Sequence, residues 1–455
     1  MKRVAIIGGG FAGLAAGVEL AARGMQVTVL EGRPRLGGRA YSFVDDDTGE
    51  VVDNGQHAMM GCYRHTLDFL ERIGASHKLV RQENLRVDML HHRFGAGTIG
   101  CVALPSPLHM LSGILGYRLL TRAERWRALL GGTRLMAMRR RRDARLMTST
   151  VEELLIALGQ SANARASFWY PVAIAMLNES PDRAAAAPFA EVLARAFFGS
   201  RRDSQFVLPK VGLSDLYTDD ARRFIEARDG CVVVKASVAS LMLHDGRVVT
   251  VQLRDGTSLE TDACISAVPP KALATLLPAA LRAASAFESL DRFEPSPIVS
   301  THLWLDRSVL DSQFVGLVGT TTQWIFNRSK LTANGNGHSP HRHGPQALSA
   351  VISAGREVAE WEPTRIADTI VADLRALVPA ARSAQVLRTV VVKEKSATIS
   401  ATPAAERLRP GAATPLPNFF LAGDWTATGL PPTIEGAVES GDRAAASVAA
   451  LLAGQ

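Results

Sequence analysis

The chain has 455 residues, of which 47% are hydrophobic and 21% are charged, a balance typical of a folded globular enzyme and not of a disordered protein. Its net charge of +7 would suit an acidic partner, but no nucleic-acid-reading module is recognisable, and no apolar run reaches the about 18 to 20 uncharged residues of a spanning helix. The 4 cysteines are scattered without a C-x-x-C pair, which argues against a disulfide framework and a zinc site. We therefore expect a reducing, cytoplasmic setting, no metal and no nucleic-acid partner.

The first segment, from Val4 to Glu31, predicts a strand, a glycine turn, a helix, a second strand and an acidic residue. Three glycines stand at the G-x-G-x-x-G spacing that binds dinucleotides, where they form a tight turn, admit a pyrophosphate and let the helix pack on the sheet. The helix N-terminus directs free N–H groups at the phosphates, and the acidic carboxylate accepts hydrogen bonds from a ribose. A glycine turn without a ligand is the less favoured alternative. The predicted cofactor residues here are Gly8, Gly10, Phe11, Ala12, Gly13 and Glu31.

A second glycine turn, this one with arginines, follows at once where a longer dinucleotide would continue. Arginine binds phosphate through two parallel hydrogen bonds, so this turn extends the predicted site. Its cofactor residues are Gly32, Arg33, Gly37, Gly38, Arg39 and Ala40.

Residues 51–57 predict a strand that ends in a polar turn with acid and base groups. His57 is the natural proton donor near neutral pH, and Asp53 or Gln56 would fix its tautomer. These three are the predicted catalytic residues. In the equally weighted alternative, Asp53 and Asn54 cap the turn and His57 is structural.

Residues 104–142 combine an apolar stretch with a basic one. Leu104 to Leu120 is rich in Leu, Met and Ile, and arginines follow that end in the run Arg139 to Arg142. Such a segment can lie on an anionic membrane surface, and a solvated helix face over the core is the equally weighted alternative. We expect residues 103–205 to form a helical cap that carries this segment.

A further part of the cofactor domain is expected at residues 206–284. Gly230 to Lys235 predicts a strand, Asp245-Gly246 and Asp255-Gly256 predict hairpin turns, and Cys264 to Pro270 predicts a buried strand that two prolines end.

Residues 285–405 predict a substrate domain on an antiparallel sheet, with one helix at about Pro363 to Leu377. Its strands are expected at residues 300–305, 314–318, 323–326, 348–353 and 386–392. Between the third and fourth strands lies a polar loop with His338, His341 and His343, for which we favour a mobile surface loop over a metal site.

The last segment, residues 406–455, returns to the cofactor. Gly423 and Asp424 end an apolar strand, where a carboxylate would bind polyol hydroxyls. Thr433 and Ile434 begin an Ala-rich helix whose N-terminal dipole would face negative charge on the cofactor. Glu435 either lies near the cofactor or caps that helix.

These motifs together resemble the flavin amine oxidase and carotenoid desaturase superfamily. The resemblance implies non-covalent FAD, because members that attach flavin use a cysteine near the late motif and none follows Cys264 here. It assigns the early glycines to the pyrophosphate, Glu31 to the adenosine ribose, Arg39 to the phosphates and flavin edge, and Asp424 to the ribityl chain, and it places Val234 beside the adenine.

The expected fold class is α/β: a discontinuous Rossmann-like FAD-binding domain with an inserted α+β substrate domain and a helical cap. The FAD-binding pieces are residues 1–102, 206–284 and 406–455, the cap is 103–205, and the substrate domain is 285–405.

Shorter signals at residues 53–57, 177–178, 209–214 and 430–435 are similar to the squalene-associated branch of this superfamily, the hydroxysqualene dehydroxylases of bacterial hopanoid synthesis. That resemblance implies a polyisoprenoid substrate, hydroxysqualene, reduced to squalene. His57 with Gln56 or Asn178 would assist departure of the hydroxyl. The predicted substrate-binding residues are Asn178, Trp169 and Leu177.

Three alternatives stay open. A carotenoid-type desaturase would use the same cofactor in the oxidising direction, and an amine oxidase is less favoured because no amine-capturing signature is evident. From another class, a prenyl-lipid carrier of the GDP-dissociation-inhibitor type would share the fold without redox chemistry. The physiological electron donor is not indicated by the sequence.

Overall fold

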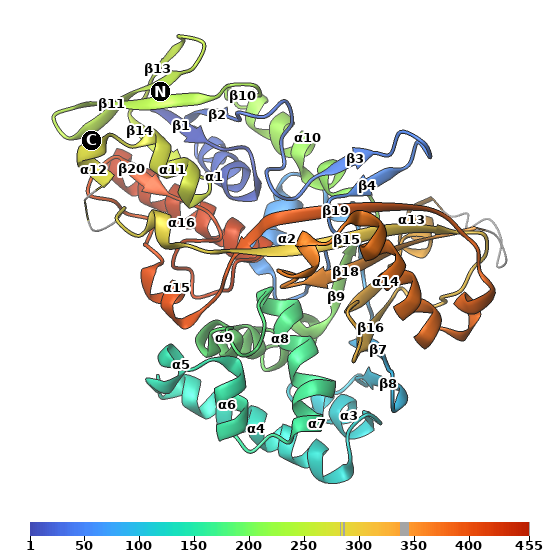
Figure 1. Ribbon diagram of the computed structural model, residues 1–455. Helices are drawn as coiled ribbons and strands as arrows, with labels where there is room; N and C mark the ends of the chain where they lie inside the picture. The colour runs from blue at the N-terminus through green and yellow to red at the C-terminus, as the bar shows by residue number, and fades with distance from the viewer. Residues whose placement is uncertain (283, 285–286, 337–344, 455) are drawn as a thin grey trace.

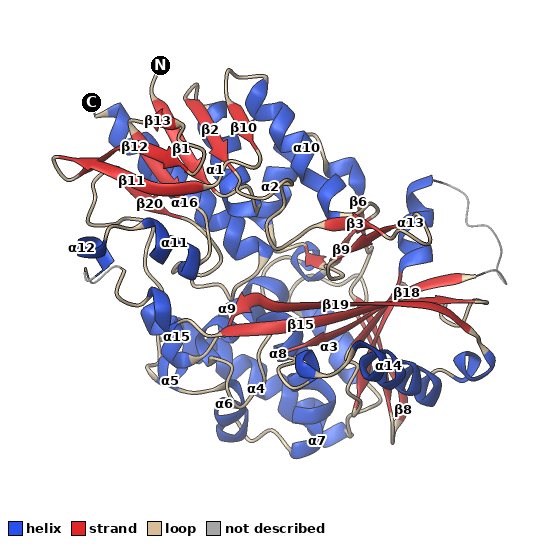
Figure 2. Cartoon of the chain, turned by 45° about the horizontal axis from the view of Figure 1, so that its top comes forward, coloured by secondary structure: helices blue, strands red, loops and turns tan. Residues whose placement is uncertain are grey.

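The computed structural model describes residues 1–282, 284, 287–336 and 345–454. The five-stranded sheet that contains β1 lies at the end of the molecule that carries both chain termini, and the helices of residues 103–205 lie at the opposite end (Figure 1). A second, larger sheet lies between them and to one side (Figure 2).

The first sheet is parallel and has five strands in the order β10-β2-β1-β14-β20. Its strands come from three distant stretches of the chain, which confirms a discontinuous Rossmann-like arrangement. They are β1 (Arg3–Ile7), β2 (Gln26–Leu30), β10 (Cys231–Val233), β14 (Ala263–Ser266) and β20 (Phe419–Leu421).

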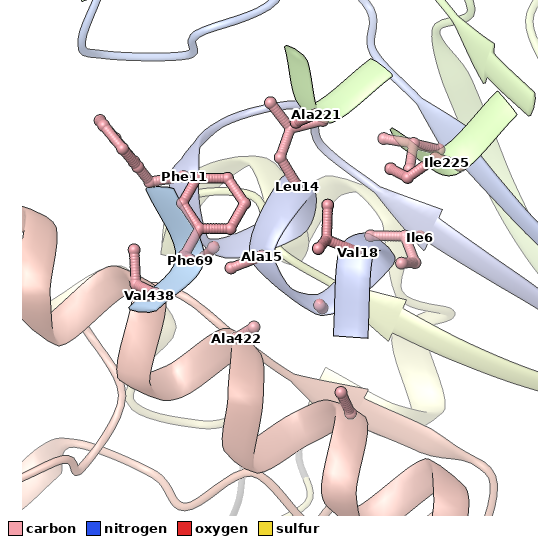
Figure 3. Close-up of a cluster of buried hydrophobic side chains, with 14 of the residues drawn as sticks. Ile6, Phe11, Leu14, Ala15, Val18, Phe69, Ala221, Ile225, Ala422 and Val438 are labelled. Atoms are coloured by element: carbon pink, nitrogen blue, oxygen red, sulfur yellow. The ribbon is translucent and has the colours of Figure 1, made fainter. Parts of the chain in front are cut away.

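Three helices pack around this sheet, and close backbone contacts hold them there. Helix α1 (Phe11–Ala22) begins directly after the glycine turn, and α10 (Leu213–Glu226) and α16 (Ile434–Ala453) lie against it. A Cβ on Gly13 would lie 1.9 Å from the carbonyl oxygen of Gly8, so only glycine permits this approach. Figure 3 shows the apolar cluster between these elements, with Phe11, Leu14 and Phe69 among its members. Phe11 also stacks on Tyr217, with ring centroids 3.7 Å apart.

The predicted hairpins form a separate antiparallel sheet of β11 (Val238–His244), β12 (Arg247–Leu253) and β13 (Ser258–Glu260). Asp245 and Gly246 both have positive φ, as the two-residue turn expected there requires.

The second sheet has seven strands in the order β19-β15-β18-β17-β16-β7-β8. Most pairs are antiparallel as predicted, but β16 and β7 pair in parallel. Helix α14 (Pro363–Leu377) lies over one face (Figure 2). The strands are β7 (Arg86–His91), β8 (Gly95–Gly100), β15 (Pro295–Leu305), β16 (Phe314–Val318), β17 (Trp324–Asn327), β18 (Gln346–Ser353) and β19 (Val386–Ile399).

The predicted division at residue 102 does not follow the sheets. Residues 86–100 were grouped with the first cofactor segment, yet β7 and β8 extend the second sheet because Val315 to Val318 pair with Asp88 to His91. The two paired strands β7 and β16 are more than two hundred residues apart in the chain, so their pairing leaves no local signal in the sequence.

Helices dominate residues 103–205. No described helix is both long enough and apolar enough to cross a membrane. Thr121 and Thr150 start α4 and α6 with reciprocal capping boxes. The helices are α3 (Leu108–Gly116), α4 (Arg122–Arg140), α5 (Arg145–Thr148), α6 (Val151–Ala157), α7 (Ala162–Ala164), α8 (Tyr170–Leu177) and α9 (Ala186–Phe197).

The remaining elements connect these layers. They are the strands β3 (Ser42–Val44), β4 (Val51–Asp53), β5 (Met59–Met60), β6 (Leu79–Arg81) and β9 (Phe206–Pro209), and the helices α2 (Arg64–Arg72), α11 (Pro270–Leu276), α12 (Ala279–Arg282), α13 (Arg328–Asn336) and α15 (Pro403–Leu408).

Candidate active site

A cavity of about 620 Å³ runs along the carboxyl ends of the parallel strands. This is the edge where open α/β sheets bind ligands. All the predicted cofactor residues line it except Gly13, which packs against Gly8, and Val234. Ala236, Ser237 and Val238 line it in place of Val234. They follow the third parallel strand directly, a position that the sheet topology alone would have indicated.

The two glycine turns meet back to back at the middle of this cavity. Gly10 is the N-cap of α1, and a Cβ built on Gly38 would lie 3.3 Å from the Cα of Gly10. The Gly37 N–H donates to the Gly9 carbonyl at 2.9 Å, which ties the second turn to the first. Bare backbone therefore faces the cavity at the point where a pyrophosphate needs a close approach.

Glu31 is fixed by its own backbone neighbours. Its carboxylate accepts hydrogen bonds from the N–H groups of Gly9 and Arg33, both at 2.8 Å. The side chain is buried and lines the cavity. It is thereby oriented for a ligand hydroxyl.

Arg39 and Asp424 join the early and late motifs. An Arg39 Nη2 donates to Asp424 Oδ1 at 2.5 Å, and Asp424 is only 5% exposed. Burial of a carboxylate is costly unless it is paired, and Arg39 supplies the opposite charge. Both residues line the cavity, so a ligand there would contact a preformed ion pair.

Glu435 caps a helix, but it is α2 and not its own helix α16. Its carboxylate accepts from the N–H groups of His65 and Thr66 and from the Thr66 hydroxyl, at 2.7 to 3.1 Å. Burial raises the pKa of Glu435 against these hydrogen bonds. Thr433 is the side-chain cap of α16. Trp425, which follows Asp424, is fully buried, and its indole N–H donates to the Val268 carbonyl.

His57 and Gln56 line the cofactor cavity, whereas Asp53 does not. The Asp53 carboxylate accepts from the Ser42 hydroxyl and the Leu213 N–H, so it ties the turn to neighbouring elements. The expectation that Asp53 or Gln56 fixes the His57 tautomer is wrong for the described residues. The Gly55 carbonyl, 2.6 Å from Nδ1, does so instead.

This contact determines what His57 can do. A carbonyl oxygen can only accept, so Nδ1 carries the hydrogen and the neutral ring has a lone pair on Nε2. Burial lowers the pKa of His57, while the Asp53 charge and the Gly55 carbonyl oppose that shift. Neutral His57 is therefore a proton acceptor at Nε2 and becomes a donor only when the ring is protonated.

A second cavity, of about 340 Å³, lies between the cap and the seven-stranded sheet. It is lined almost wholly by apolar side chains, and eight residues line both this cavity and the cofactor cavity, so the two adjoin. The shared residues are Gln56, Ala58, Tyr63, Ala175, Met176, Val351, Ser353 and Thr433.

Of the three predicted substrate-binding residues, one lines this apolar cavity and two do not. Trp169 lines it, with its indole N–H bonded to Gln160. Leu177 is buried in the cap core and does not line it. Asn178 faces the cofactor cavity, but its amide is used: Nδ2 donates to Ser296 and Thr398, and Oδ1 accepts from Ala354. Asn178 therefore has no free N–H for a departing hydroxyl.

Sequence reasoning missed most of the cavity wall. Phe206, Phe314, Trp324 and Phe326 come from strands of two sheets, and their aromatic character was the only signal. The three histidines at 338, 341 and 343 lie outside the described residues. Among the residues that are described, no His, Cys, Asp and Glu cluster suited to a metal occurs.

The chain is similar to known proteins along nearly its whole length. The sequence profile of a family described as flavin containing amine oxidoreductase matches residues 11–449. The chain is 28% identical to a hydroxysqualene dehydroxylase of Sinorhizobium fredii, over 98% of this chain and 97% of the relative. It is 25% identical to a 15-cis-phytoene desaturase of Synechococcus elongatus, over 98% and 96%.

Solved structures show the same fold. An oxidoreductase from Methanosarcina mazei has a TM-score of 0.75 at 18% identity, covering 97% of this chain and 99% of that one. Putrescine oxidase bound to putrescine has a TM-score of 0.72 at 19% identity, covering 99% of each chain.

Proposed function

The chain belongs to the flavin-containing amine oxidoreductase family, and from this premise we propose that it binds FAD non-covalently and reduces hydroxysqualene to squalene. The observation that carries the proposal is the apolar cavity, which lies between the cap and the seven-stranded sheet and adjoins the cofactor cavity. A long hydrocarbon needs such a passage, and the relatives named hydroxysqualene dehydroxylase support the same substrate class.

The residues that line the cofactor cavity fit FAD. The N–H groups around Gly10 and the bare turn at Gly38 would hold the pyrophosphate, Glu31 the adenosine ribose, and the Arg39–Asp424 pair the phosphate and ribityl side. The N-terminus of α16, with Thr433 and Ile434 on the cavity wall, would stabilise negative charge on the ring.

Bound in its reduced form, FAD supplies the hydride that replaces the hydroxyl. The substrate carbon–oxygen bond breaks, a carbon–hydrogen bond forms, and the hydroxyl takes a proton and leaves as water. The chain's part is to hold the carbon near the junction of the two cavities and to keep other water out. Apolar walls such as Trp169, Met176 and Phe206 do this, so that hydride reaches the carbon first.

Protonated His57 is the proposed proton donor. It lines the cofactor cavity one residue from Gln56 and Ala58, both at the junction of the cavities. The Gly55 carbonyl orients its ring, and the Asp53 charge favours the protonated form. Gln56 remains available as a hydrogen-bond donor to the departing oxygen.

One observation favours a second candidate, a carotenoid-type desaturase. Neutral His57 presents an accepting Nε2, which suits removal of a proton from a substrate that is being oxidised. A phytoene desaturase is also among the relatives.

The direct test is an anaerobic single turnover. Holoenzyme reduced with dithionite should convert hydroxysqualene to squalene while the oxidised flavin absorbance returns. In D2O, one deuterium from the exchanged flavin should appear on squalene carbon. If reduced enzyme leaves hydroxysqualene untouched and oxidised enzyme dehydrogenates phytoene, the desaturase is the correct assignment.

We also propose that the cap contacts an anionic membrane, at the cytoplasmic face, from which the substrate enters. Five large apolar side chains of residues 104–142 are exposed: Leu104 before α3, Leu108 and Leu111 on the outer side of α3, and Trp126 and Leu130 on α4. Arginines of α4 flank them. The inner side of α3 is core, so the amphipathic segment is half buried.

Two of the arginines expected at the membrane have other partners. Arg125 donates to the carbonyls of Leu115 and Leu120. Arg139 pairs with Glu191 at 2.7 Å. The lipid-facing charge would therefore come from the other exposed arginines of this region, which are Arg118, Arg122, Arg127, Arg134, Arg140, Arg141 and Arg142.

A further inference from the structure

The outer end of the apolar cavity is formed by a few exposed residues of the cap. Most residues that line the cavity are buried or half-buried. Apart from Ala175, which also lines the cofactor cavity, the exposed ones are Pro107, Leu111, Thr133 and Phe198. They lie before and on α3, on α4, and at the end of α9, and α4 contacts both α3 and α9. We call these four residues, with Gly132, the mouth.

Helix α4 contains two adjacent glycines, and packing accounts for only one of them. A Cβ on Gly131 would lie 2.6 Å from Nε2 of Gln160. That amide is fixed, because it donates to the Arg127 carbonyl and its oxygen accepts from the Trp169 indole. Gly131 is therefore required for α4 to pack against Gln160.

Gly132 has no such constraint. The nearest heavy atom to its Cβ position is Cζ of Phe198, at 3.9 Å, which is an ordinary contact. Its φ is not positive, and it lies inside a 19-residue helix, where glycine is less stable than alanine. What distinguishes the position is that it lines the cavity opposite Phe198.

We propose that Gly132 is a specificity-determining residue: because it has no side chain, the Phe198 ring can lie against α4, and the mouth beside the ring stays wide enough for a branched isoprenoid chain to enter. The inference rests on the proposed function for the identity of that chain. A side chain longer than alanine at 132 would fill the space beside the ring and narrow the mouth. Phe198 is 41% exposed at the end of α9, so its ring limits the opening of the mouth and contributes little to core packing.

The experiment compares uptake of squalene by oxidised holoenzymes. Stopped-flow quenching of tryptophan fluorescence reports entry, because Trp169 and Trp324 line the cavity. The variants are Gly132→Leu, Phe198→Ala and the double variant. Ala137→Leu is the control, since it adds the same side chain to an exposed position of α4 that does not line the cavity.

Gly132→Leu should slow squalene association by about tenfold, as expected for a crowded passage. Phe198→Ala should not slow it, and the double variant should return to within about threefold of wild type because the lost ring offsets the added leucine. A short isoprenoid alcohol such as farnesol should enter all variants at similar rates. Flavin content and thermal unfolding of each variant verify the fold.

The outcomes separate this proposal from the reaction. If squalene enters wild type and Gly132→Leu equally fast, or the double variant stays slow, the role of Gly132 is refuted. If the variants behave as expected but hydroxysqualene is not reduced, the role of Gly132 is supported and the proposed reaction is refuted. If wild type takes up no squalene, both are overturned. Should Gly132→Leu misfold, Phe198→Trp, which also adds bulk at the mouth, must slow entry.

Discussion

The protonation of His57 should govern the pH dependence of the proposed reaction. Burial lowers the pKa of this ring below its ordinary 6.5, so at neutral pH most molecules carry the neutral ring. Only the protonated ring can give a proton to the departing hydroxyl, because Nδ1 is committed to the Gly55 carbonyl. The rate of dehydroxylation should therefore rise as pH falls.

The magnitude follows from the protonated fraction. Above its pKa, each added pH unit lowers that fraction tenfold, so the logarithm of the rate should fall with a slope of about −1 above about pH 7. The plateau should be reached only below pH 6.5, because the shift of His57 is downward. His57→Ala should lose about a hundredfold or more on the plateau, and less at higher pH, where few wild-type rings are protonated.

The assay is flavin reoxidation by hydroxysqualene in anaerobic stopped flow, from about pH 5 to pH 9, with FAD content measured at each pH. His57→Ala should retain FAD and show a flat profile. A wild-type rate that rises with pH would identify His57 as a base and refute the donor role. A rate in His57→Ala equal to wild type would place the proton source elsewhere.

The remaining predictions concern the cofactor, the cap of α2 and the membrane face. Gly10→Val should fold but bind no FAD, because the Cβ position at Gly10 is 3.7 Å from its nearest atom and the rest of the valine side chain enters the cavity. Gly13→Val should misfold, because a Cβ there lies 1.9 Å from the Gly8 carbonyl oxygen. Flavin absorbance and thermal unfolding distinguish the two outcomes. Glu435→Ala should lower the free energy of unfolding by about 3 kcal/mol in urea, because a cap and a buried hydrogen-bond acceptor are lost together; a change below about 0.5 kcal/mol would contradict the capping role. Trp126→Ser should weaken binding to anionic liposomes in a flotation assay, while Met242→Ser, equally apolar and exposed but on β11, should not; equal loss in both would exclude this face.

Local patterns predicted much of the fold. The first strand, glycine turn and helix, the strand at Phe314–Val318 and the helix at Pro363–Leu377 agree with the structure because each is specified by its own residues. The alternation of apolar residues does not depend on distant partners. The placement of β7 and β8 could not be read in this way, because it depends on pairing with β16.

The roles of side chains at the site were harder to predict, because they too depend on partners that are distant in sequence. The residue types at 53 and 178 suggested chemistry, but Asp53 holds Ser42 and Leu213, and the Asn178 amide is used by backbone and Thr398. The direction of a side chain in a turn depends on partners that lie far away in sequence. Backbone glycines were predicted better, because their role depends on the absence of a side chain.

The ion pair of Arg39 with Asp424 determines when, during synthesis of the chain, the cofactor site can be completed. Its partners are 385 positions apart, and β20 and α16, which complete the first sheet and cover α1, also come from the end of the chain. A nascent chain emerges from the ribosome over many seconds, beginning with the glycine turn. The Arg39–Asp424 ion pair can therefore form only in the last tenth of translation. Cofactor loading is thus expected to be a late, post-synthetic event, and the supply of free flavin at that moment should limit the yield of active enzyme.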